Sequence, residues 1–259
     1  MKHIEKSPVE PERLANYREH HPRDTWDKFH KRDRVGYRQL KEQLLRDQHG
    51  LCAYCEISIR LSDNEDEVDD FRVEHFHPKS GTERSEHNYH LDWRNLLGVC
   101  HGGSQPYVAE ARYRYASRVE DRSCDVPKSD KALENVILNP LEIPASARLF
   151  KYDPFTGAME VDEETCPREL VRKARRSVEE LNLNCERLKR LRRAAMEVLQ
   201  EQVDNSLQDG LSLDETMALL ARAMLNPGPD GRYAAFFTCI RWFLGSAAET
   251  FLQQRHYRI

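Results

Sequence analysis

The stretch LCAYCE, residues 51–56, decides how the first half of this chain folds. Cys52 and Cys55 are separated by two residues, which is the spacing of a knuckle that holds half of a zinc site. A tetrahedral zinc ion needs two further soft ligands. Cys100 in LLGVCHGGSQ, residues 96–105, supplies one of them, but Gly103 stands where a second knuckle would place the other. A zinc site therefore requires a fourth ligand from elsewhere in the chain.

Two residues compete to be that fourth ligand. Cys124 follows an insertion, residues 101–122, that would separate the two halves of the second knuckle. His101 would instead complete a set of three cysteines and one histidine, which is also common in structural zinc sites. Neighbouring side chains such as Cys100 and His101 have difficulty binding one ion in tetrahedral geometry, so Cys124 is preferred. We therefore predict a structural Zn²⁺ site made of Cys52, Cys55, Cys100 and Cys124.

The composition is that of a soluble protein without a general coat of positive charge. Of the 259 residues, 39% are hydrophobic and 32% are charged, and the formal net charge is -4. An odd number of cysteines, seven, argues against a disulfide framework and favours metal binding by some of them. No apolar run approaches the roughly eighteen residues of a membrane-spanning helix, and the N-terminal MKHIEKSPVE lacks the apolar core of a signal peptide. We expect a cytoplasmic protein with no membrane segment.

A second chemical signal is VEHFHPKS, residues 73–80. Adjacent residues of a strand point in opposite directions, but near a bend one side chain can bind a divalent ion while the next approaches the substrate. We assign Glu74 as a ligand of a catalytic Mg²⁺ or Mn²⁺ ion and His75 as the general base that activates water for attack on a phosphodiester. The alternative is an ordinary strand histidine beside a surface glutamate. His77 could support a neighbouring ligand, contact phosphate or simply lie on the surface.

Asp125 and two lysines complete this candidate site. Asp125 directly follows Cys124 and begins a predicted helix, so it would supply a second carboxylate to the catalytic ion. A carboxylate at a helix start is also the usual N-terminal cap, which is the alternative role for Asp125. Lys79 and Lys128 are expected to contact the phosphates of a nucleic acid.

The pattern along the chain predicts an α+β protein, mostly helical, in three parts. Residues 1–36 are polar and rich in Pro, His and Arg, and we expect an extended arm rather than a core element. Residues 37–160 would form the zinc-stabilised module, with a helix over 38–48, two short strands in the segments 71–76 and 90–100, and a helix that starts at 129. A hairpin that turns at residues 156–157 lies near its end.

Residues 161–259 show apolar residues at helical spacing and should form a C-terminal helical region. One of its helices carries a capping-box signature, with Ser212 followed by Glu215. Basic residues crowd the segment 168–193: Arg168, Arg172, Lys173, Arg175, Arg176, Arg187, Lys189, Arg190, Arg192 and Arg193. This basic segment could attract nucleic acid, form a solvated face paired with neighbouring glutamates, or dock onto an acidic partner.

CAYCE, VEHFHPKS, WRNLLGVC and CDVPK, in this order, resemble the motif of the HNH (ββα-metal) nucleases. The resemblance implies a ββα-metal core in which His75 is the base and Asn95 orients the loop between the strands. The last residue of that motif, a His or Asn, is a metal ligand on the helix, and Asp125 stands at the matching place here. Aspartate binds Mg²⁺ well, so this departure is chemically acceptable.

The chain is still more similar to the PtuB-like HNH proteins of Septu-type and retron-associated antiphage systems. DQHGLCAYCE, ILNPLE and VEELNLNCERLKRLR extend the likeness over about residues 40–200. This resemblance implies a defence effector that works beside an ABC/SMC-like ATPase, in some systems with a retron reverse transcriptase and its msDNA. We expect a metal-dependent endonuclease that hydrolyses DNA. The alternatives are a nuclease acting on RNA such as tRNA, and a non-catalytic zinc-stabilised module that binds nucleic acid or a partner.

Overall fold

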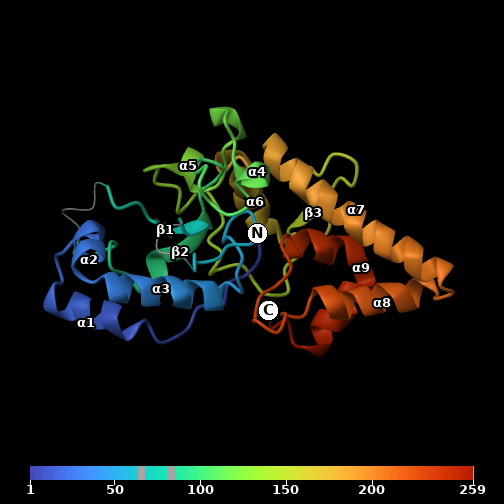
Figure 1. Ribbon diagram of the computed structural model, residues 1–259, viewed down its shortest axis with the longest axis horizontal. Helices are drawn as coiled ribbons and strands as arrows, with labels where there is room; N and C mark the ends of the chain where they lie inside the picture. The colour runs from blue at the N-terminus through green and yellow to red at the C-terminus, as the bar shows by residue number, and fades with distance from the viewer. Residues whose placement is uncertain (64–67, 81–85, 259) are drawn as a thin grey trace.

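The computed structural model describes residues 1–63, 68–80 and 86–258. Within these ranges the chain forms helices and two small antiparallel sheets, a mixture consistent with the predicted α+β class (Figure 1). The helices are α1 (Glu12–His20), α2 (Trp26–Arg32), α3 (Arg34–Asp47), α4 (Ala111–Arg114), α5 (Asp125–Lys128), α6 (Arg168–Glu180), α7 (Glu186–Gln208), α8 (Leu213–Met224) and α9 (Phe237–Gln254). The strands are β1 (Phe71–His75), β2 (Leu96–Cys100), β3 (Phe150–Tyr152) and β4 (Met159–Val161). No helix in the described ranges is long and apolar enough to cross a membrane.

Strands β1 and β2 pair as the sequence predicts, and the two faces of β1 have different neighbours. The antiparallel register places His75 opposite Leu96. The His75 ring packs edge-on against Trp26 at a centroid distance of 4.9 Å, on the face covered by the N-terminal helices. Because side chains alternate across a strand, Glu74 lies on the other face, where it meets Lys128 of α5. The hairpin therefore separates a hydrophobic face from a charged one.

The prediction of an extended arm over residues 1–36 is wrong, because α1 and α2 lie within it. Leu14, Tyr17, Trp26 and Phe29 are buried there, in a hydrophobic cluster shared with α3 and β2. These two helices have only nine and seven residues, so their few apolar side chains stand between charged ones and show no sustained helical period. Helix α3 is present but begins at Arg34 rather than at residue 38.

The knuckle that follows α3 lies against β2. Gln48 binds both backbone groups of Gly98: its Nε2 donates to Gly98 O at 2.8 Å, and its Oε1 accepts from Gly98 N at 2.7 Å. Ala53 N also donates to Gly98 O, at 3.1 Å. An edge strand otherwise leaves such groups unpaired, so these bonds attach the segment of Cys52 and Cys55 to the strand that ends in Cys100.

The insertion between β2 and α5 is closed at its base. Ser123 N donates to Gly102 O, and Ala116 N donates to Gly103 O, both at 2.9 Å. Gly102 has a φ of +59°, and a Cβ atom there would meet Ser123 O at 2.1 Å, so no other residue fits. The chain thus leaves and returns at one point, and Cys124 comes back beside the end of β2.

Helix α5 is shorter than the sequence indicates. It covers Asp125–Lys128, and the helix expected from residue 129 is not formed. Ser129 has a φ of +47°, a left-handed conformation that an α-helix cannot continue through. The order strand, strand, helix is therefore present around the candidate site, while the assignment of a ββα-metal core stays a prediction.

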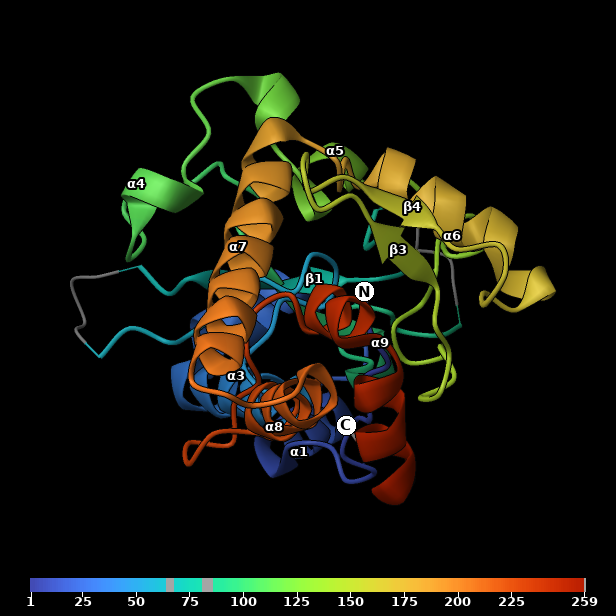
Figure 2. The same cartoon turned by 90° about the vertical axis from the view of Figure 1, so that its right-hand side faces the viewer.

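The predicted β3–β4 hairpin and the C-terminal helices are present. Gly157 turns the hairpin with a φ of +72°, and Ser212 and Glu215 form the predicted capping box. In the view of Figure 2, α7 runs upright above α8, and α9 lies beside them. The buried carboxylate of Glu56 accepts hydrogen bonds from Thr238 N and Oγ1, at 2.8 and 2.9 Å, which joins α9 to the knuckle. The boundaries at residues 36–37 and 160–161 stay a prediction, since one hydrophobic cluster includes residues of the module and of the C-terminal helices.

Candidate active site and cysteine cluster

The four predicted zinc ligands meet in one buried cluster. The Sγ atoms of Cys52, Cys55, Cys100 and Cys124 all lie within 4.8 Å of one another. Three of the separations are 3.6 Å (Cys55 to Cys100), 3.7 Å (Cys100 to Cys124) and 4.0 Å (Cys52 to Cys124). A tetrahedral ion with bonds of about 2.3 Å to sulfur would hold its ligands about 3.8 Å apart. The cluster therefore has the size and the ligands for one metal ion such as zinc.

Cys124 rather than His101 completes the cluster. The His101 ring is bound elsewhere, with Nε2 at 2.8 Å from Asp69 O. Cys124 has a φ of +63°, which is costly for a residue with a Cβ atom and persists only where the surroundings enforce it. Burial raises the pKa of the Cys124 thiol well above its usual range, and the neighbouring sulfurs raise it further. A nearby cation would remove this penalty and favour the thiolate.

A pocket of about 440 Å³ includes Asp125, the residue after Cys124, and several other predicted site residues, but Asn95 is not among the described residues that line it. Its lining includes Glu74, His75, Lys79 and Asp125, which come from β1, the loop after it and α5. Arg72 of β1 also lines this pocket. The sequence-based prediction missed Arg72, although its place two residues before Glu74 puts both side chains on one face of the strand.

The Glu74 carboxylate is held by a buried lysine. Lys128 Nζ lies 2.7 Å from Glu74 Oε1 and donates to the carbonyl of His75 at 3.1 Å. The Tyr54 hydroxyl also approaches Oε1, at 3.5 Å. Burial raises the pKa of Glu74 to about 7, against the opposing effect of Lys128. Only 1% of the Lys128 side chain is exposed, so the prediction that Lys128 contacts nucleic acid is wrong: its ammonium is occupied inside the protein.

Asp125 has one oxygen bound and one without a partner. Its Oδ2 forms an ion pair with Arg72 Nε. Its Oδ1 is buried and has no hydrogen-bond partner in the part of the chain that the structure describes. Burial raises the pKa of Asp125, although the Arg72 guanidinium counteracts this. Buried polar oxygens are nearly always satisfied, so this oxygen is the atom at which a further ligand would supply the missing contact.

One ring nitrogen of His75 is bound to a backbone carbonyl. Its Nε2 lies 3.1 Å from the carbonyl oxygen of His90. Because a carbonyl can only accept, this contact places the proton on Nε2 and leaves a lone pair on Nδ1. Burial lowers the pKa of His75 to about 3, so the imidazole is neutral at neutral pH. A neutral imidazole with a free lone pair is the form that can take a proton from water.

Asn95 clamps the turn that follows β1. Its Oδ1 accepts from His77 N at 2.7 Å, and its Nδ2 donates to the carbonyls of His77 and Tyr89 at 3.0 and 2.9 Å. The side chain therefore joins the exit of β1 to the approach to β2. The His77 ring stacks on Tyr89 at 3.8 Å, and its Nε2 lies 3.6 Å from Glu134 Oε1. His77 does not line the pocket, within the residues that the structure describes.

Replacing Asn95 by alanine is expected to lower the free energy of unfolding by about 2–3 kcal/mol, since three backbone groups of a largely buried turn would lose their partner. Chemical denaturation measures this loss. Asn205→Ala, on an exposed position of α7, removes the same side chain where it holds no turn. Equal unfolding midpoints for the two variants would show that the clamp contributes nothing.

The basic segment 168–193 is not a uniform positive surface. Arg187 and Arg192 are buried, and Arg192 donates to the carbonyls of Gly157 and Leu183 at 2.7 and 2.9 Å. Several others form ion pairs on the surface: Arg175 with Glu163, Arg176 with Glu179 and Glu180, Lys189 with Glu186, and Arg193 with Glu197. These contacts favour the solvated, paired face among the alternatives for this segment.

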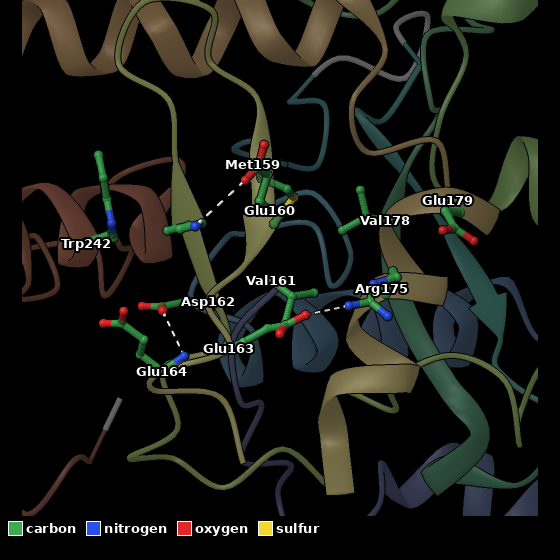
Figure 3. Close-up of a pocket in the computed structure, with 11 residues that line it drawn as sticks. Met159, Glu160, Val161, Asp162, Glu163, Glu164, Arg175, Val178, Glu179 and Trp242 are labelled. Carbon is green, nitrogen blue, oxygen red and sulfur yellow. Dashed lines mark hydrogen bonds and ion pairs between the residues drawn. The ribbon is translucent and has the colours of Figure 1, made fainter. Parts of the chain in front are cut away.

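A larger pocket of about 840 Å³ lies elsewhere, between the β3–β4 hairpin, α6 and α9. Figure 3 shows that Arg175 is turned toward Glu163, and their charged atoms are 2.6 Å apart. The lining carries more carboxylates than basic groups: Glu160, Asp162, Glu163, Glu164 and Glu179 against Lys151 and Arg175. An acidic wall repels phosphate, so its size does not make this pocket the nucleic-acid site.

The comparison with known proteins defines the class of this protein. No family model matches the chain. It is, however, 35% identical to an Escherichia coli protein described as "Retron Ec83 putative HNH endonuclease", over 209 residues that cover 74% of this chain and 78% of that protein. The chain therefore belongs to the family of retron-associated HNH endonucleases, which are hydrolases that act on nucleic acids.

Proposed function

We propose that this endonuclease hydrolyses phosphodiester bonds of DNA with the help of a divalent cation, as the effector of an antiphage defence system. The observation that carries the proposal is the pocket whose lining includes Glu74, His75 and Asp125, from β1 and α5. These residues are the carboxylate, base and helix-borne ligand that the chemistry requires. His75 borders this pocket from the end of β1, although its ring also packs against Trp26 on the opposite face of the strand. Lys79, which also lines the pocket, supplies a positive charge for a phosphate.

The donor set fits Mg²⁺ or Mn²⁺. Such ions are bound by one or two carboxylates and complete their coordination with water and substrate oxygens. Glu74 and Asp125 would hold the ion, and the Oδ1 of Asp125, which has no hydrogen-bond partner among the described residues, supports this assignment. When bound, the cation stabilises the charge that develops on the phosphate oxygens.

His75 is the proposed general base. Its Nδ1 takes a proton from the attacking water while the water oxygen forms a bond to phosphorus and the bond to the leaving oxygen breaks. The contact between Nε2 and the carbonyl of His90 holds the ring in the required tautomer. Asn95 keeps the turn beside it in place, which is a positioning role.

The cysteine cluster is proposed to hold a structural Zn²⁺ ion. The separations of the four sulfur atoms and the burial of all four thiols support this proposal. The ion would join the knuckle, the end of β2 and the start of α5, and α5 also lines the pocket.

The partners are proposed from the resemblance to retron-associated and Septu-type systems. We infer that the nuclease works beside an ABC/SMC-like ATPase and a retron reverse transcriptase with its msDNA. The relation to a retron-associated nuclease supports the second partner more directly than the first.

The test is a cleavage assay on plasmid DNA and on total RNA with Mg²⁺, Mn²⁺ or a chelator. Wild-type protein is expected to cleave DNA with either metal and to lose activity with the chelator. Glu74→Gln keeps the shape of the side chain but removes its charge, and should be inactive on the same DNA. Cleavage of RNA alone would favour the alternative substrate. Full activity of Glu74→Gln would overturn the site assignment.

A further inference from the structure

Lys128 is a lysine whose ammonium group does not reach the surface. Only 1% of its side chain is exposed. Lysine is almost never fully buried unless it is paired, and here both partners of the ammonium belong to the end of β1: Glu74 Oε1 at 2.7 Å and the carbonyl of His75 at 3.1 Å. One buried cation on α5 thus fixes the two adjacent residues that carry the proposed chemistry.

Stability alone does not account for this arrangement. Taking a lysine and a glutamate out of water is expensive, and a pair of well-packed apolar side chains of similar size is often at least as stable. Lys131, three positions further along, shows the ordinary alternative: it is 54% exposed and lies 3.4 Å from Glu180. The burial of Lys128 therefore points to a role in the site.

The contacts divide the carboxylate oxygens in a regular way. Lys128 and Tyr54 both approach Oε1 of Glu74, and neither contact uses Oε2. Arg72 binds Oδ2 of Asp125, whose Oδ1 has no partner among the described residues. In each carboxylate, a basic side chain binds one oxygen. This contact fixes the direction in which the second oxygen of the same carboxylate points.

We propose that Lys128 is a positioning residue of the nuclease site. It orients the Glu74 carboxylate so that one oxygen can bind the divalent cation, and it holds the backbone of His75 where the base must lie. The inference rests on the proposed roles of Glu74 and His75. The sequence predicted that Lys128 contacts a nucleic acid. The proposal gives this lysine a role inside the protein instead.

The proposal predicts weaker metal binding when Lys128 is replaced. Loss of a positive charge would by itself favour a dication, but without Lys128 the Glu74 carboxylate loses the contact at Oε1 that fixes its direction. Lys128→Met, purified with zinc, is therefore expected to bind Mn²⁺ at least tenfold more weakly than the parent by electron paramagnetic resonance. The Mn²⁺ concentration for half-maximal DNA cleavage should rise with it.

Lys131→Met is the matched control, because it removes the same group from an exposed position of the same segment. Circular dichroism establishes that each variant is folded. Lys128→Gln keeps a hydrogen-bond donor without the charge, and it carries the comparison if Lys128→Met does not fold; its Mn²⁺ affinity should fall in the same direction by a smaller factor. A folded Lys128 variant that binds Mn²⁺ as tightly as the parent, or more tightly, overturns the proposal.

Glu74→Gln separates this inference from the proposed function. If Glu74→Gln loses Mn²⁺ binding while the folded Lys128 variants retain it, only the positioning role fails. If Glu74→Gln binds Mn²⁺ and cleaves DNA as the parent does, the site itself is misassigned.

Discussion

Cys124→Ser is expected to lose its metal ion and a large part of its folding stability. The other three proposed ligands come from the knuckle and from β2, whereas Cys124 directly precedes α5. Structural zinc contributes about 10–16 kcal/mol in small zinc-dependent domains, so an average share of about 2.5–4 kcal/mol falls to each of four thiolates. A serine hydroxyl is a much poorer zinc ligand, and most of that share should be lost.

Metal analysis and chemical denaturation measure the two effects. The protein should carry one zinc ion per chain, whereas Cys124→Ser should carry much less and unfold at a lower denaturant concentration. Cys166→Ser is the control, because Cys166 is also a buried thiol but lies outside the cluster. If Cys124→Ser retains the zinc content and unfolding midpoint of Cys166→Ser, Cys124 is not a ligand, and His101 becomes the candidate again.

His75→Ala is expected to reduce the rate of DNA cleavage by about 10²–10⁴-fold, the usual contribution of a general base. The loss should appear at saturating Mg²⁺ or Mn²⁺, because the variant retains both proposed metal-binding carboxylates. Removal of the ring also leaves a gap beside Trp26, so the unfolding midpoint should fall modestly. Single-turnover cleavage at saturating metal measures the rate.

His77→Ala is the control for this prediction. His77 lies two residues after His75, and its ring contacts Tyr89 and Glu134. His77→Ala should therefore keep most of the activity. Equal losses in the two variants would mean that the turn, and not the His75 imidazole, limits the reaction.

The cysteine cluster and the strand pair could be predicted from the sequence because local patterns encode them. The spacing of Cys52 and Cys55 marks a knuckle, and alternation marks β1. Cys124 could be predicted as well, because a zinc site with three cysteines needs one more ligand. The candidates for that ligand were Cys124 and His101. What fixes its position, the contact between Gly102 and Ser123, involves residues that carry no obvious signal in the sequence.

The N-terminal helices and the contacts inside the pocket could not be predicted in the same way. Trp26 and Phe29 lie in a short helix whose stability comes from packing against β1 and β2, and such contacts are not visible in local periodicity. Lys128 has a charged side chain, which a sequence pattern assigns to the surface. Its burial depends on Glu74, which is far away in the chain. The arrangement of side chains on the charged face of this site therefore depends on ion pairs between residues that are distant in the sequence.

The closed base of the insertion has a consequence for how this protein can vary. Since Gly102 and Ser123 are joined by a backbone hydrogen bond, the length of chain between them does not set the distance from Cys100 to Cys124. Lengthening a closed loop costs only about 0.6 kcal/mol for each doubling. Segments of very different size and sequence can therefore occupy this position, while the cysteine cluster and the pocket beside it keep their geometry.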